Sequence, residues 1–95
     1  MRRVHVTIHG RVHGVFFRAY VRDCATRLGI KGFVRNIPDG VDAVFEGSDE
    51  NITDILQSCR KGPAGAKVVR LEVKDEKYRG EFKDFRIVYE REEEI

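Results

Sequence analysis

The sequence has no long run of apolar residues, which excludes the proteins that depend on one. Nothing in its 95 residues approaches the roughly 18 consecutive apolar residues that a membrane-spanning helix needs. The N-terminal stretch MRRVHVTIHG is basic but lacks the apolar region of roughly 7–15 residues of a secretory or twin-arginine signal. We therefore expect a cytoplasmic protein with no membrane partner.

Cysteine and metal-ligand clusters are also scarce. The two cysteines, Cys24 and Cys59, have neither C-x-x-C nor zinc-finger spacing, so we expect reduced, buried thiols and no disulfide framework. His5 and His9 lie on one predicted strand, which separates them by about 13 Å at about 3.3 Å per residue, too far to share an ion. We expect both histidines to be exposed, and we expect no metal and no cofactor.

Neither positively nor negatively charged residues dominate the sequence. The chain has 18 Lys and Arg against 16 Asp and Glu, a net charge of +2, which is too small for a dedicated nucleic-acid binder. Its length allows one domain. We therefore expect a monomer with no nucleic-acid partner, in which residues 1–90 fold as a single domain. The charged C-terminal tail, residues 91–95, is expected to be solvated and frayed.

Two hydrophobic periods alternate along the chain. Alternation every second residue predicts strands, and spacing of three to four residues predicts helices. The strands are expected at 3–9, 31–37, 41–47, 66–74 and 85–89, and the helices from about residue 16 to 28 and from about residue 49 to 61. Gly29 ends the first helix, Ser48 or Asp49 caps the second, and Pro38-Asp39-Gly40 predicts a hairpin turn. In the fourth strand, Val69, Leu71 and Val73 share one face.

This order of elements predicts an α+β fold. The pattern βαββαβ, with a possible fifth strand, is typical of a ferredoxin-like α/β sandwich. We expect a four- to five-stranded antiparallel sheet with both helices on one face. Because that layout serves enzymes, RNA binders and regulators alike, it does not choose a function.

The most informative segment is GRVHGVFFR, residues 10–18, where a loop with two glycines joins a strand to a helix. Such a junction presents free backbone N–H groups and the positive end of the helix dipole. Arg18 falls in the first helical turn, where a cation is disfavoured unless it shares an anion with the loop. An ordinary turn followed by a surface arginine explains the residues equally well. The segment is not a nucleotide P-loop, because no Lys follows Gly14.

Two further segments suggest chemistry. Asn36 has an amide that can orient a water molecule, although an Asn before Pro-Asp-Gly is also a favoured turn residue. Lys31-Gly32-Phe33 begins like an RNA-recognition strand, but the second stacking aromatic is missing. A non-catalytic ferredoxin-like module that binds an anion or RNA therefore stays open as the alternative function. An RNA binder needs aromatics on the open sheet face, where the first strand offers only Arg3, His5, Thr7 and His9.

Taken together, these segments resemble the acylphosphatase family, over about residues 3–90. The family's loop signature, G-R-V-Q-G-V-x-F-R, is matched by residues 10–18, and its G-W/F-V-x-N signature by residues 32–36. Further matches are Pro38-Asp39-Gly40, Gly62-Pro63 with Ala66, Val68 and Val73, and the closing strand with Phe85 and Ile87. Two departures are His13 in place of the usual Gln and a hairpin turn that is one residue shorter than in many relatives.

The resemblance implies hydrolysis of acyl phosphates to a carboxylate and inorganic phosphate, without metal. It implies that Arg18 and the backbone amides of residues 14–18 hold the phosphoryl oxygens. It also implies that Asn36 positions the attacking water, and no protein base is required if the substrate phosphate takes the proton. The candidate phosphate-binding residues are His13, Gly14, Val15, Phe16, Phe17 and Arg18, with Gly10 and Gly14 as loop glycines. His13 either adds a donor to the anion or points to solvent.

Overall fold

The secondary structure follows the predicted order. The computed structural model describes residues 1–89, so the predicted tail 91–95 lies outside the described residues. The elements are β1 (Arg2–Arg11), α1 (Phe17–Arg27), β2 (Lys31–Ile37), β3 (Gly40–Gly47), α2 (Asp49–Lys61), β4 (Lys67–Glu76) and β5 (Phe85–Ile87). Gly29, at φ +71°, follows the end of α1, and the side chain of Ser48 caps α2, as their sequences predict.

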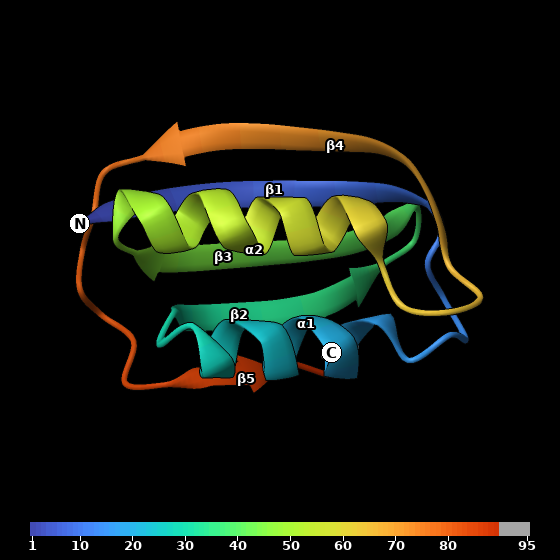
Figure 1. The fold of residues 1–95 in the computed structure, drawn as a ribbon, viewed down its shortest axis with the longest axis horizontal. Coiled ribbons are helices and arrows are strands. Elements are labelled where there is room, and N and C mark those ends of the chain that lie inside the picture. The colour runs from blue at the N-terminus through green and yellow to red at the C-terminus, as the bar shows by residue number, and fades with distance from the viewer. Residues whose placement is uncertain (90–95) are drawn as a thin grey trace, which may run out of the picture.

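The strands form one sheet in the order β4-β1-β3-β2-β5, and both helices cover the same face of it (Figure 1). The predicted ferredoxin-like α/β sandwich is therefore confirmed. The core lies between the sheet and the helices, where Val4, Val6 and Ile8 of β1 are fully buried. No helix in the described part of the chain is long and apolar enough to span a bilayer.

One strand pair departs from the expected antiparallel sheet. β5 pairs in parallel with β2, in the register Gly32↔Phe85 to Val34↔Ile87, so the sheet is mixed. The reason is the connection from residue 77 to 84, which leaves β4 at one edge and passes to the opposite edge of the sheet (Figure 1). Since β4 runs opposite to both β1 and β2, a chain that turns back after β4 necessarily runs parallel to β2.

The inward face of β4 also differs from the expectation. The pairing with β1 shifts between His9 and Gly10, so that Val69 faces no partner and the alternation slips by one residue. Val68 and Leu71 consequently pack against the core, whereas the side chain of Val69 is 72% exposed. The predicted placement of Val69 beside Leu71 is therefore wrong, because the sequence pattern does not reveal the bulge.

A buried carboxylate fastens the connection that leads to β5. The Glu46 side chain, 3% exposed, accepts a hydrogen bond from Arg3 at 3.1 Å and from the backbone N–H groups of Arg79 and Gly80 at 3.1 and 3.3 Å. Burial alone would lower the pKa of Arg3, but its hydrogen bonds to Glu46 and two further carboxylates raise it. The guanidinium therefore stays charged and holds the connection that delivers β5 to β2.

Paired charges cover much of the open face of the sheet. The His5 Nε2 atom lies 2.6 Å from a carboxylate oxygen of Asp42, whose side chain is 7% exposed, and Arg35 binds the other oxygen at 3.3 Å. His5 and His9 are thus half-buried and hydrogen-bonded rather than simply exposed. Phe33 lies on this face as well, but the ring of Phe82 packs edge-on against it at 5.9 Å. That contact covers part of the Phe33 ring.

Candidate functional site

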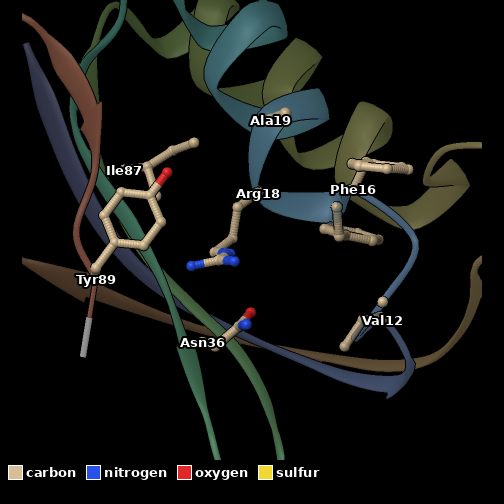
Figure 2. A pocket seen from close by; sticks show the side chains of 9 residues that line it. Val12, Phe16, Arg18, Ala19, Asn36, Ile87 and Tyr89 are labelled. Atoms are coloured by element: carbon tan, nitrogen blue, oxygen red, sulfur yellow. The ribbon is translucent and has the colours of Figure 1, made fainter. Parts of the chain in front are cut away.

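A cavity of about 320 Å³ opens where the β1–α1 loop meets β2 and the end of the described chain (Figure 2). Three segments far apart in the sequence contribute to it: the loop with the first turn of α1, the end of β2, and the residues from β5 onward. The residues that line it are Val12, Gly14, Phe16, Phe17, Arg18, Ala19, Asn36, Ile87 and Tyr89. The two residues singled out independently in the sequence, Arg18 and Asn36, therefore meet in one cavity.

Glycine is needed at the two loop positions for different structural reasons. At Gly10, with φ +136°, a Cβ atom would collide with the backbone carbonyl of Lys67, so only glycine lets β4 approach β1 here. Gly14 has open space around it but adopts φ +71°, a conformation that side chains rarely accept. Gly14 thus lets the loop turn toward α1 and form one side of the cavity.

The start of α1 and the loop before it have backbone N–H groups that lack acceptors within residues 1–89. Among the described residues, no protein acceptor pairs with the backbone N–H groups of residues 14–18. Phe16, at the N-cap, makes no side-chain cap, and the first turn holds no acidic residue. The positive end of the helix dipole and a set of unpaired N–H groups therefore face the cavity, as an anion site requires.

Arg18 extends from the first turn of α1 into the cavity (Figure 2). Its guanidinium carbon lies 5.0 Å from the ring centroid of Tyr89, and no carboxylate among residues 1–89 pairs with it. The aromatic ring holds the guanidinium through a cation–π contact and takes up none of its N–H donors. Those donors remain available for two oxygens of one anion.

Asn36 belongs to β2 rather than to the hairpin turn. It pairs with Val41 of β3, and the alternation along β2 places its side chain on the same face as the buried Val34, toward α1. In Figure 2 its amide points toward the guanidinium of Arg18. The shorter hairpin keeps this register, since Ile37 pairs with Gly40 directly across the turn. A role in turn formation alone therefore does not explain Asn36.

Two of the predicted phosphate-binding residues do not line the cavity with their side chains. The Nε2 atom of His13 lies 2.7 Å from the carbonyl oxygen of Gly40, to which it donates a hydrogen bond. This bond ties the loop to the hairpin that carries Asn36. Val15 packs half-buried against the core and is not among the lining residues.

Four lining residues were not predicted as part of the site, namely Val12, Ala19, Ile87 and Tyr89. Ile87 and Tyr89 are close to Asn36 only because β5 pairs in parallel with β2, which local patterns do not predict. Arg18 and Tyr89 are the ionisable side chains among the lining residues, so no carboxylate, imidazole or thiol of the described chain is in reach as a base. Burial raises the pKa of the Cys59 thiol to about 12, which keeps it protonated and unreactive.

Metal ligands do not gather in the described residues. No group of three or more His, Cys, Asp or Glu side chains among residues 1–89 is arranged to hold an ion. At the cavity itself, the polar groups are the guanidinium of Arg18, the amide of Asn36 and backbone N–H groups, which are donors suited to oxygen-rich anions rather than ligands of a cation.

Comparison with known proteins identifies relatives over almost the full chain. The family model for acylphosphatase matches residues 4–87. The chain is 50% identical over 91 residues to an acylphosphatase of Syntrophus aciditrophicus, covering 95% of both chains. It is 52% identical to an acylphosphatase of Syntrophobacter fumaroxidans, covering 95% of this chain and 94% of the relative. The crystal structure of an acylphosphatase from Bacillus subtilis superposes with a TM-score of 0.90 at 29% identity, over 94% of this chain and all of that one.

Proposed function

The chain belongs to the acylphosphatase family of enzymes, and we propose that it hydrolyses acyl phosphates in the cavity at the start of α1. In this proposal Arg18 and the loop amides bind the phosphate, and Asn36 orients the water. The observation that carries it is the meeting of Arg18 and Asn36 in one cavity beside an uncapped helix start.

Binding begins with the negative charge of the phosphoryl group. Its oxygens accept hydrogen bonds from the N–H groups of residues 14–18. The planar guanidinium of Arg18 donates two further hydrogen bonds to them. The cation–π contact with Tyr89 limits the rotamers of Arg18 before substrate arrives. Because these donors are already in place, little reorganisation is needed as charge shifts among the oxygens during the reaction.

Hydrolysis then needs a water molecule in line with the bond that breaks. The amide oxygen of Asn36 accepts a hydrogen bond from this water and directs its lone pair at phosphorus. The new P–O bond forms as the bond to the carboxylate oxygen breaks, and the carboxylate leaves with the electron pair. The proton of the water passes to a phosphate oxygen of the substrate, since the lining residues include no general base.

The remaining parts of the proposal concern the setting of the reaction. We propose a monomer that acts in the cytoplasm on a small-molecule acyl phosphate, with no cofactor and no nucleic-acid partner. The near balance of positive and negative residues and the mutual pairing of charges on the open sheet face support the lack of a nucleic-acid partner. Sedimentation of the purified chain at the mass of a dimer would contradict the monomer.

The direct experiment measures hydrolysis of benzoyl phosphate in excess EDTA. We expect rapid turnover by the wild-type chain, a loss of about 1,000-fold in kcat/KM for Arg18→Ala and of about 100-fold for Asn36→Ala. Arg22→Ala is the matched control, since Arg22 lies one turn further along α1 and outside the cavity. Turnover that EDTA abolishes, or that survives both cavity variants, would overturn the proposed mechanism.

A further inference from the structure

Phe16 is held in a conformation that its own chemistry disfavours. It has φ 60° and ψ 31°, and it is the one residue other than glycine with a positive φ in the described chain. For an L-residue this left-handed conformation is unfavourable, and Asn or Gly would adopt it more readily. Phe16 is also 86% exposed, so burial of its ring does not offset the strain. Folding alone therefore does not account for a phenylalanine here.

Tyr89 is a second exposed aromatic side chain at the same cavity. It is 65% exposed, and its ring covers the guanidinium of Arg18 from the side of β5. Three aromatic residues in the described chain are both large and exposed, namely Phe16, Tyr78 and Tyr89, and two of them line this one cavity. Scattered exposed apolar residues need no explanation, whereas two at one site call for a ligand.

The two rings lie on either side of the phosphate-binding groups. In Figure 2, Phe16 and Tyr89 appear on opposite sides of Arg18, with Ile87 next to Tyr89. The donors, Arg18 and Asn36, lie together in one part of the cavity, and the rest of the lining is apolar or aromatic. A phosphoryl group presents only oxygen atoms, and these accept hydrogen bonds from the donors of the cavity. The apolar remainder of the 320 Å³ cavity is left for the other half of a mixed anhydride.

We propose that Phe16 and Tyr89 form the acyl subsite and that the chain selects acyl phosphates whose acyl group is aromatic or large and apolar. This inference rests on the proposed function and adds its substrate class. A ring or long chain carried by the substrate packs between the two side chains, whereas an acetyl group is too small to reach both. An aromatic contact contributes about 0.5–1.5 kcal/mol beyond the area it buries, which corresponds to roughly 2- to 12-fold in kcat/KM.

The experiment compares kcat/KM for benzoyl phosphate with kcat/KM for acetyl phosphate, and follows the ratio between the two substrates. Phe16→Asn removes one ring while keeping a residue that tolerates the left-handed conformation. Tyr89→Leu removes the other ring, and Tyr78→Leu is the matched control, since Tyr78 is exposed but does not line the cavity. Each ratio is taken relative to wild type, so differences in leaving-group chemistry cancel.

We expect the benzoyl-to-acetyl ratio to fall about 3- to 10-fold in Phe16→Asn and in Tyr89→Leu, and to stay within 2-fold in Tyr78→Leu. Damage to the phosphate-binding groups lowers kcat/KM for both substrates by the same factor and leaves the ratio unchanged. An unchanged ratio in both cavity variants, with hydrolysis still measurable, would overturn the acyl subsite and leave the proposed function intact. A wild-type chain that hydrolyses neither substrate would overturn both.

Discussion

The two helices of this small protein begin in opposite ways. The start of α2 is closed by the chain itself, because the Ser48 side chain accepts a hydrogen bond from the N–H of Asn51 at 3.1 Å, and Asp49 and Glu50 occupy the first turn. The start of α1 has no such cap, no acidic residue and a strained Phe16 at the N-cap. Both helices pack on the same face of the same sheet, so the fold does not impose the difference.

The difference separates stability from function within one architecture. A capped helix start with acidic residues in the first turn is worth about 1–2 kcal/mol, and α2 obtains it. α1 forgoes that stabilisation and carries Arg18 in its first turn, where the helix dipole disfavours a cation. In the proposed function, the phosphate of the substrate compensates the unpaired N–H groups and the positive charge of Arg18. Substitutions that make one helix start resemble the other test this difference.

Among substitutions that make one helix start resemble the other, Ala19→Glu should produce the largest effect, because it gives α1 the acidic first turn that α2 has. Ala19 lies in the first turn and lines the cavity, from where a glutamate can reach back to the N-cap N–H. We expect the free energy of unfolding to rise by about 0.3–1 kcal/mol. Acyl phosphate hydrolysis should fall about 100-fold, since a like charge about 6 Å from phosphate costs roughly 2–3 kcal/mol.

Ala19→Gln is the control for that variant, since it has the same shape without the charge. It should retain most of the hydrolysis that Ala19→Glu loses. Equal losses in kcat/KM for the glutamine and glutamate variants would mean that bulk, rather than charge, closes the site. That result would contradict an anion site at the start of α1.

Ser48→Ala should affect stability alone, because it removes the side-chain cap at the start of α2. Loss of the hydrogen bond to Asn51 is expected to lower the free energy of unfolding by about 1 kcal/mol, as chemical denaturation measures it. Ser48→Asp should restore stability, since aspartate also caps helices. Hydrolysis should be unchanged in both variants, because Ser48 lies outside the cavity. A loss of hydrolysis in Ser48→Ala would show that the two helix starts are not independent.

Phe16→Asn should change stability in the direction opposite to Ser48→Ala, and by no more than that variant does. Asparagine accepts the left-handed conformation that phenylalanine resists, and its side chain can cap the helix. We expect the free energy of unfolding to rise by about 0.5–1 kcal/mol in the absence of phosphate. A lower stability in this variant would mean that the exposed ring of Phe16 contributes to folding after all.

The sequence predicted the parts of the site that depend on local chemistry. Residues 10–18 indicated a strand, a glycine turn and a helix start with an arginine, and the structure has all of these. The spacing of residues 31–37 predicted the strand on which Asn36 lies. That these residues line one cavity depends on the packing of α1 against β2, which is a contact between elements rather than a local pattern.

Features that depend on distant pairing could not be predicted. Tyr89 lies near Arg18 only because β5 crosses to the far edge of the sheet and pairs in parallel with β2. The bulge opposite His9 and Gly10 exposes Val69, which alternation alone would bury. His13 contacts the carbonyl of Gly40, a partner 27 positions away in the sequence. Each of these outcomes depends on contacts between residues that are distant in the sequence, which local patterns do not specify.

The most direct test of the central claim is a titration of the chain with inorganic phosphate, followed through the resonances of its backbone amides. If the uncapped start of α1 is the phosphate site, the amides of residues 14–18 should shift with saturation, and those of residues 49–51 at the capped start of α2 should not. Arg18→Ala should weaken the binding that these shifts report. Shifts of equal size at both helix starts, or none at residues 14–18, would contradict the account.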